Sequence, residues 1–218
     1  MVDGTRLVIF LLLPASAVMM TMAEPIVRLL FQRGAWTPDQ TPGVADAMMA
    51  FALGLALNGV LLLLTRCFFA LQHVWAATAI AFVNLVVAAG LSLALYRPCG
   101  VWGIPLANSI ANMVVVPLLW TMLSRRVGRP DRRGVLLSTV VALAASIAVG
   151  VAAYAAWYGL DRLLGTSLPA QIAAVGVPVA GAAAVYIAGM HRLGVPEAGR
   201  IVELARTRLR RGEQEQPE

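Results

Sequence analysis

Hydrophobic residues in this chain form long runs that no charged residue interrupts. The runs Pro98–Ser124, Val135–Leu160 and Leu163–Met190 carry no formal charge, and each exceeds the about 20 residues that a helix needs to cross the hydrocarbon of a bilayer. Lipid offers the backbone no hydrogen-bond partner, so a segment inside a bilayer satisfies its own N–H and C=O groups by forming a helix. Each run therefore predicts one transmembrane helix.

The first half of the chain predicts three more spans. Leu7–Ala23 is uncharged and continues toward Phe31, and Ala47–Thr65 is a second uncharged run. The longer run Cys67–Tyr96 contains the polar pair Gln72-His73, which we interpret as the end of one helix and the start of the next. The predicted spans are about 7–31, 44–71, 77–96, 101–124, 135–160 and 167–190, within a membrane region at 1–195.

An alternative for the first span is a cleaved signal peptide, because the small residues Thr21 and Ala23 follow its apolar stretch. Signal peptides begin with an excess of positive charge. Here Asp3 offsets Arg6, so the leading segment lacks that excess, and a membrane span is the favoured interpretation.

The composition excludes an ordinary soluble domain. Of the 218 residues, 60% are apolar and 13% are charged, and the mean hydropathy is +0.79. Soluble domains carry about 25% charged residues, so this chain has too few polar side chains to cover a globule in water. The sequence predicts an all-α membrane protein with six transmembrane helices.

The basic residues indicate how the chain lies in the membrane. The net charge is +6, and all seventeen basic residues are arginine. Nucleic-acid binding is not expected, because no soluble fold is present to carry a phosphate-binding surface. With Ser124–Gly134 in the cytoplasm, thirteen arginines lie inside, and only Arg28, Arg33, Arg97 and Arg162 lie outside. Arginine-rich loops stay in the cytoplasm, so both termini are predicted to be cytoplasmic.

Arginines at the inner surface are predicted to contact anionic lipid head groups. These residues are Arg125, Arg126, Arg132, Arg133, Arg206, Arg208, Arg210 and Arg211. The last four belong to the segment 196–218, which opens with Pro196 and Glu197, residues typical of a first helical turn. We expect a basic amphipathic helix there that lies on the cytoplasmic membrane surface and ends in a polar tail.

No set of side chains suggests catalysis or metal binding. The predicted topology places Cys67 and Cys99 near opposite faces of the bilayer, so they cannot share a disulfide or a metal ion. His73 and His191 fall at inner helix ends, where an interfacial side chain is the simplest interpretation. The sequence has no glycine-rich phosphate loop and no Ser/His/Asp set. We therefore expect neither enzyme activity nor a cofactor.

Polar side chains inside the apolar spans are the candidates for a substrate path, because a polar group facing lipid is costly and turns toward protein or water. The candidates are Asn58, Arg66, Asn84, Asn108 and Asn112. Asn108 and Asn112 have the i, i+4 spacing that places both on one helix face. Two interpretations stay open: hydrogen bonds that join helices, worth about 0.6 to 2 kcal/mol each, or the lining of a solute path.

Three local patterns predict the shape of the helices. Pro14, Pro25, Pro105, Pro117 and Pro178 fall within predicted spans, where each proline removes a backbone hydrogen bond and bends its helix. Glu24 and Arg28 have the spacing of an ion pair near an outer helix end. The small residues of Val179–Ala184 either permit close helix approach or leave a shallow groove.

One motif resembles a known protein family. After Pro14, the stretch Ala23–Ala35 is followed by Thr37 and Asp39, and together they resemble the second half of MurJ/MviN proteins. Gly54, Arg66, Phe69–Gln72, Asn84, Gly100, Gly103 and Ala107 then follow in the order that this family shows. The similarity covers about Leu11 to Arg126, and its motif residues are Glu24, Pro25, Arg28, Phe31, Arg33, Gly34, Asp39 and Gln72.

The resemblance implies a flippase of the multidrug/oligosaccharidyl-lipid/polysaccharide (MOP) exporter superfamily. Such a flippase moves lipid II, the lipid-linked peptidoglycan precursor, across the bacterial inner membrane by alternating access. The family has fourteen spans, in two lobes plus a final pair, and this chain resembles spans nine to fourteen, a partial bundle. The final pair would form a groove for the lipid tail. The implied partners are membrane lipids, the lipid-linked precursor and the missing N-terminal lobe, on the same polypeptide or as a separate chain.

The sequence departs from the family pattern in two respects. Members usually follow the Leu-Gln pair with Asp and then Thr-Pro, whereas this chain has His73–Ala77. The arginines of the family's first lobe have no counterpart here, and alternating access needs two units around one site, so the chain is expected to be incomplete alone. The alternatives are another exporter of the superfamily, for polysaccharide-linked lipids or drugs, and a membrane scaffold without transport activity.

Overall fold

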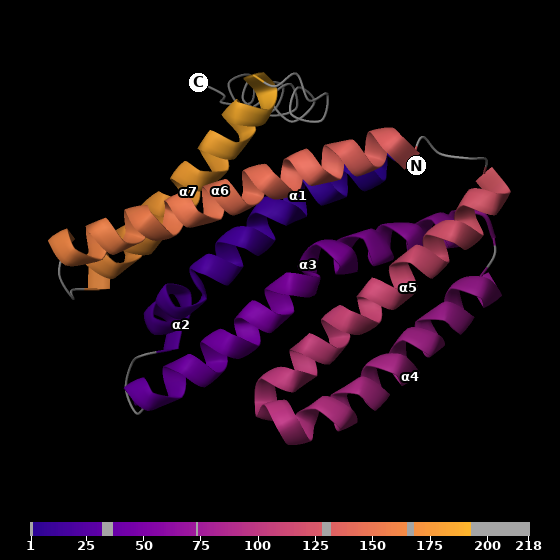
Figure 1. Cartoon of the computed structure of the whole chain (residues 1–218), viewed down its shortest axis with the longest axis horizontal. Coiled ribbons are helices and arrows are strands. Elements are labelled where there is room, and N and C mark those ends of the chain that lie inside the picture. Colours follow the sequence, from indigo (N-terminus) through magenta and orange to yellow (C-terminus); the bar gives the residue numbers. More distant parts are fainter. Residues whose placement is uncertain (1, 32–36, 73, 128–131, 165–167, 193–218) are drawn as a thin grey trace, which may run out of the picture.

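All regular structure in the described part of the chain is helical (Figure 1). The structure is a computed structural model that describes residues 2–31, 37–72, 74–127, 132–164 and 168–192. Its long helices are α1 (Val2–Thr21), α3 (Thr41–Ala70), α4 (Val74–Cys99), α5 (Gly103–Val127), α6 (Arg132–Leu164) and α7 (Leu168–Arg192). The short ones are α2 (Ala23–Phe31), η1 (Pro38–Gln40) and η2 (Gly100–Trp102).

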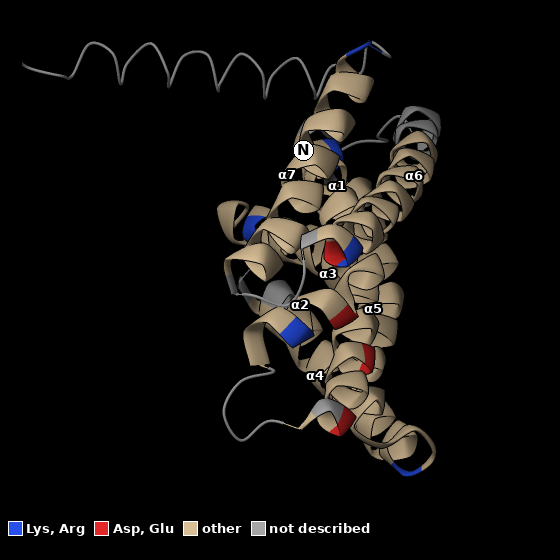
Figure 2. Cartoon of the chain, turned by 90° about the vertical axis from the view of Figure 1, so that its left-hand side faces the viewer, with Lys and Arg blue, Asp and Glu red and all other residues tan. Residues whose placement is uncertain are grey.

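The long helices have the length and composition of membrane spans. Among the described residues, five continuous apolar segments are long enough to cross a membrane, and one of them, Thr78–Ser124, contains most of both α4 and α5. The predicted all-α membrane fold is confirmed, and six long helices agree with the six predicted spans. Charged residues are sparse along the ribbon in Figure 2, as a hydrocarbon surrounding requires.

Helix α1 joins the two halves of the bundle. It packs against α6 on one side and α3 on the other, while α7 lies on α6 and α5 and α4 lie beyond α3 (Figure 1). One apolar core joins α1, α6 and α7 and includes Phe10, Trp157 and Tyr186. A second core joins α3 to α5 around Phe68 and Leu119. The first predicted span is thus an integral part of the packed bundle.

The first span is not one straight helix, because the chain bends between α1 and α2. Pro25 has no N–H, so it cannot donate to the carbonyl of Thr21 in the preceding turn. In the same turn, the Thr21 hydroxyl donates to the Ala17 carbonyl oxygen at 3.0 Å. The backbone bonds on either side persist, from Met22 N to Val18 O at 2.9 Å and from Ile26 N to Met22 O at 3.0 Å. The bend predicted at Pro25 is therefore present.

The other prolines divide into two groups. Pro14, Pro117 and Pro178 lie inside α1, α5 and α7, as predicted. The prediction that Pro105 interrupts its span is wrong, because Pro105 is the third residue of α5. The N–H groups of the first turn have no acceptor within a helix, so a proline there removes no hydrogen bond.

Two turns depend on left-handed backbone positions. Helix α3 ends at a turn in which Gln72 has φ +59°, and its N–H donates to the Phe69 carbonyl oxygen at 2.9 Å. Between α4 and α5, Gly100 has φ +64°, a conformation that glycine adopts without steric cost. A side chain at Gly103 would meet the Leu95 carbonyl oxygen at 2.7 Å. These requirements give a structural reason for the glycines at positions 100 and 103, whereas the left-handed backbone of Gln72 does not itself call for glutamine.

Small residues allow the helices to approach closely. A Cβ atom at Gly54 of α3 would lie 2.4 Å from Oγ and 2.8 Å from Cα of Ser109 on α5. A Cβ atom at Gly150 of α6 would lie 3.1 Å from the Ala17 carbonyl oxygen on α1. Lipid is as apolar as the helices, so their association depends on close packing and hydrogen bonds rather than on the hydrophobic effect.

We predict that Gly54→Ala destabilises the bundle. The added methyl group meets backbone atoms of α5, which cannot move away as a flexible side chain can, and overpacking of this kind costs about 1–3 kcal/mol. Thermal unfolding of the detergent-purified protein should show a lower melting temperature. Gly90→Ala on α4 is the matched control, because nothing lies within 4 Å of its added Cβ. Equal melting temperatures for the two variants would show that the α3–α5 approach is not tightly packed.

Candidate functional site

Two of the five substrate-path candidates meet between α4 and α5. Asn84 donates from Nδ2 to Oδ1 of Asn112 at 3.4 Å. Asn112 is 1% exposed, and within the described part of the chain Asn84 Oδ1 and Asn112 Nδ2 are buried without a hydrogen-bond partner. The pair thus links α4 to α5. Within the described structure it leaves one acceptor, Asn84 Oδ1, and one donor, Asn112 Nδ2, without a hydrogen bond.

The remaining candidates do not join this pair. Asn108 is half-buried one turn earlier on α5, whereas Asn58 and Arg66 are exposed on α3. Ser109 follows Asn108 on α5 and donates from Oγ to the Ala50 carbonyl oxygen of α3 at 2.8 Å. The polar face of α5 therefore contacts both of its helical neighbours. The five residues do not converge on one site in the described structure.

Motif residues at one end of the bundle pair with each other. Arg28 Nη2 lies 3.0 Å from Glu24 Oε1, which confirms the ion pair predicted from their spacing. Pro25 is buried, whereas Phe31 and Asp39 are exposed. Arg33 and Gly34 lie outside the described residues. Because both charged partners are partly exposed, the ion pair itself contributes little to stability.

Aromatic and charged residues of α6 lie at the same end of the bundle. Arg28 shares a shallow depression with Trp157 and Asp161. Tyr158 and Arg162 are the next residues of α6 after Trp157 and Asp161. The Arg162 guanidinium donates to the Tyr158 hydroxyl and lies 4.2 Å from the centre of its ring. An aromatic ring beside a cation is typical of side chains at a membrane interface.

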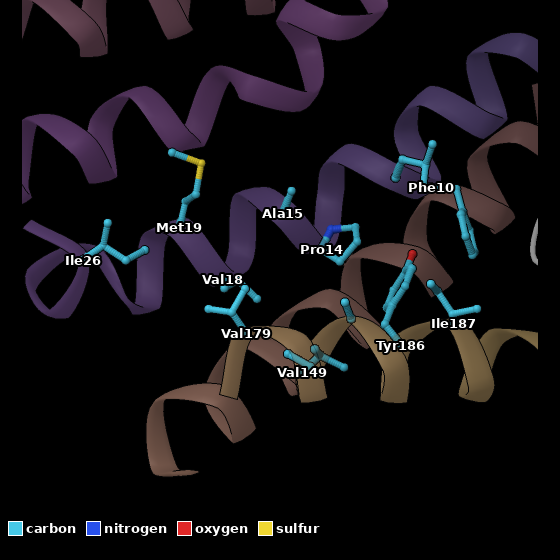
Figure 3. A pocket seen from close by; sticks show the side chains of 13 residues that line it. Phe10, Pro14, Ala15, Val18, Met19, Ile26, Val149, Val179, Tyr186 and Ile187 are labelled. Atoms are coloured by element: carbon cyan, nitrogen blue, oxygen red, sulfur yellow. The ribbon is translucent and has the colours of Figure 1, made fainter. Parts of the chain in front are cut away.

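An apolar groove lies between α1, α6 and α7 (Figure 3). We call it the α1–α7 groove. It has a volume of about 310 Å³, and its lining includes Pro14 and Val18 of α1, Val149 of α6, and Val179 and Ala183 of α7. All but a small part of the lining surface is hydrocarbon, so the groove fits an apolar chain and not a sugar.

Tyr186 forms one end of the α1–α7 groove. Its ring reaches from α7 toward Pro14 (Figure 3) and packs against Phe10, with ring centres 5.0 Å apart. Ser146 of α6 lies beside its hydroxyl and donates its own proton to the Ala142 carbonyl oxygen at 2.6 Å. Sequence reasoning missed Phe10 and Tyr186 as groove residues and left open whether Val179–Ala184 forms a groove. Only contact between distant helices reveals the site.

Several other predicted sites lie outside the described side chains. Arg206, Arg208, Arg210 and Arg211, with the helix predicted at 196–218, are not among the described residues, and neither is His73. The positions of Arg125, Arg126, Arg132 and Arg133 fall at the facing ends of α5 and α6, and nothing is described of their side chains. His191 is exposed at the end of α7, and Cys67 and Cys99 are free thiols. In the described part, no group of three His, Cys, Asp or Glu residues is placed to hold a metal ion.

Comparison with known proteins decides the family. The family model described as lipid II flippase MurJ matches residues 1–174. This chain belongs to the MurJ family. The match covers all of α1 to α6 and ends within α7, so the Asn84–Asn112 pair and most of the α1–α7 groove lie within the region of the MurJ family model.

Individual relatives are named as members of the same family, but each of them is much longer than this chain. The probable lipid II flippase MurJ of Rhizobium meliloti is 31% identical over 94% of this chain and 38% of its own length. That of Rhizobium tropici is 26% identical over 89% of the chain and 37% of its own length. A solved structure, lipid II flippase MurJ in an inward closed conformation, has a TM-score of 0.61 at 17% identity over 84% of this chain and 37% of that one. This MurJ-family chain thus spans less than two fifths of these relatives.

We predict that Asn84 and Asn112 serve helix packing. Asn112→Ala and Asn84→Ala should each lower the melting temperature, and a double-mutant cycle should give a coupling of about 0.6–1.7 kcal/mol, the range measured for interhelical hydrogen bonds in membranes. Asn58→Ala is the exposed control and should change stability by less than about 0.5 kcal/mol. Loss of transport with unchanged melting temperatures would instead favour a solute path.

Proposed function

We propose that this chain is the C-terminal part of a lipid II flippase in the bacterial inner membrane. It takes part in moving the lipid-linked peptidoglycan precursor outward by alternating access, together with the part of the protein that it does not span. Membership of the MurJ family and the flippase function named for its relatives support the proposal. The chain acts as a transporter component and not as an enzyme.

The observation that carries the proposal is the α1–α7 groove. A lipid-linked precursor has a long hydrocarbon tail that stays in the bilayer while its polar head crosses. The groove is lined almost wholly by hydrocarbon and lies between helices long enough to span a membrane. We assign the tail to this groove, which agrees with the family-derived expectation that the last two helices hold it.

We predict that Ala183→Phe weakens tail binding. Ala183 lines the groove and is exposed, so a phenyl ring there occupies the space of the tail without disturbing the core. Binding of undecaprenyl phosphate to the purified chain should fall about tenfold, the equivalent of about 1.4 kcal/mol of lost contact. The control Ala184→Phe makes the same change on the next residue of α7, which is exposed and does not line the groove.

Transport is tested with the chain and the remainder of a relative together. We expect co-expression with the part of the Rhizobium meliloti relative that this chain does not cover to restore growth and outward lipid II transport in cells depleted of their own flippase. Ala183→Phe should reduce the restored transport, and Ala184→Phe should not. Accumulation of a different lipid-linked saccharide on depletion would point to another exporter of the superfamily.

We also propose that both termini are cytoplasmic, because the excess of arginines on that side fixes the orientation. This orientation places Cys99, at the end of α4, outside and Cys67, near the end of α3, inside. A membrane-impermeant maleimide added to spheroplasts should label Cys99 and leave Cys67 unlabelled until the membrane is opened. Cys99→Ser and Cys67→Ser identify the labelled residue, and labelling of Cys67 alone would invert the topology.

A further inference from the structure

The α1–α7 groove has two unlike ends. Met19 of α1 and Ile26 of α2 line one end, and Phe10 of α1 and Tyr186 of α7 line the other (Figure 3). We call them the α2 end and the aromatic end. From Phe10 to Met19 the groove follows α1 for about 14 Å, at about 1.5 Å per residue. A chain-like ligand in this groove can therefore lie in either of two directions.

Two packed rings close the aromatic end. The ring centres of Phe10 and Tyr186 lie 5.0 Å apart, and each residue is 3% exposed. Because one ring comes from α1 and the other from α7, the pair crosses the groove from one wall to the other. Thr5 and Arg6 lie about one turn further toward the start of α1 and do not line the groove. The aromatic pair thus ends the hydrocarbon lining before these polar side chains.

The α2 end borders charged side chains. The shallow depression that contains Arg28 and Asp161 also includes Pro25, which precedes Ile26, and Val175, which lies one turn along α7 from the groove lining. The Arg28 side chain is 38% exposed, and a charged group in a membrane protein is stable where it reaches water or a polar partner. A polar head group can therefore stay hydrated at the α2 end while its hydrocarbon lies in the groove.

One side of the α1–α7 groove is open. Its lining includes Leu11, which is 46% exposed, and Ala183, which is also exposed. A tail can therefore enter from the bilayer without threading past either end, and a tail longer than the groove can turn out of it at the aromatic pair. The two ends then decide the direction in which the tail lies.

We infer that the α1–α7 groove takes the lipid tail in one direction, with the polar head at the α2 end and the hydrocarbon running toward Phe10 and Tyr186. The inference rests on the proposed function, because it gives a direction to the tail that the proposed function places in this groove. With both termini in the cytoplasm, as proposed above, α1 runs outward to α2. The groove then holds a lipid whose head lies at the outer surface, the position that the head reaches after it has crossed.

Photocrosslinking with two matched probes tests the direction. Both probes are farnesyl phosphates that carry one benzophenone, at the far end of the hydrocarbon in one probe and beside the phosphate in the other. Each probe is added to the purified chain in detergent, and the adducts are located by mass spectrometry. Two hollows of about 390 Å³ each lie along α3, on the other side of α1, and share Met20 and Leu53. Adducts at Leu53 therefore measure unspecific binding to an apolar surface.

We expect reciprocal patterns from the two probes. The far-end probe should label residues of the aromatic end about fivefold more than residues of the α2 end, the ratio that a difference of about 1 kcal/mol between the two directions gives. The phosphate-end probe should show the opposite ratio. Undecaprenyl phosphate should displace both sets of adducts and leave those at Leu53 unchanged. Ala183→Phe should reduce both sets, whereas the control Ala184→Phe should not.

Substitutions at the aromatic end test the role of the rings. Tyr186→Phe keeps the ring and should keep the pattern of the far-end probe. Tyr186→Ala removes the ring that α7 contributes, so the far-end adducts should spread past Phe10 toward Thr5. Phe10→Leu opens the same end from α1 and replaces Tyr186→Ala if that variant does not fold.

Two kinds of result contradict the inference in different ways. If the far-end probe labels the α2 end, or if both probes label the two ends equally, the tail lies in the groove but not in the inferred direction. The same conclusion follows if opening the aromatic end leaves the far-end adducts where they are. If neither probe gives displaceable adducts in the groove, the assignment of the tail to the groove under the proposed function fails, and the direction fails with it.

Discussion

Close helix approach through small residues is the contact on which this structure depends. Lipid removes the hydrophobic drive that holds a soluble core together, so the helices are held by dispersion contacts and a few hydrogen bonds. At Gly54 the backbones of α3 and α5 come so near that a methyl group would overlap Ser109. The Ser109 hydroxyl, held there, also reaches the Ala50 carbonyl oxygen. Packing and hydrogen bonding at this point therefore reinforce each other.

The small residues that allow this close packing also account for the two grooves on either side of α1. Between α1, α6 and α7, alanine and valine leave space that the larger Phe10 and Tyr186 close at one end. Along α3, alanines form a floor, but Ser16 and Asp46 add polar groups without partners among the described residues. A groove lined almost wholly by hydrocarbon suits a lipid tail, whereas the hollows along α3 also include the exposed carboxylate of Asp46. The chemistry of their linings distinguishes the two grooves, whereas their volumes alone would not.

Bends and turns position these surfaces. The missing hydrogen bond at Pro25 separates α2 from α1 and brings Arg28 beside α6 residues at one end of the bundle. Gly100 and Gly103 let α4 return along α5 so that Asn84 meets Asn112. Several residues that the family shares thus have a local structural purpose, which is separate from any direct contact with a transported lipid.

The sequence by itself was enough to predict that the chain lies in lipid, where its helices are, and which family it resembles. Uninterrupted apolar runs are long-range patterns that need no tertiary contact to be recognised, and the i, i+4 spacing of Glu24 and Arg28 was enough to predict their ion pair. The motif around Phe31 was sufficient to indicate the MurJ family. Pro105 was misjudged because a proline bends a helix only beyond its first turn, and the start of α5 depends on the turn at Gly100.

Only the tertiary structure decided which faces meet. An asparagine in a span looks the same in sequence whether it lines a path or joins two helices, and the contact of Asn84 with Asn112 appears only when α4 lies on α5. The grooves are likewise formed by residues far apart in the chain, such as Pro14 with Ala183 and Ser16 with Ile147. Hydropathy records how much apolar surface a helix has, and the packing of its neighbours decides how much of it remains open.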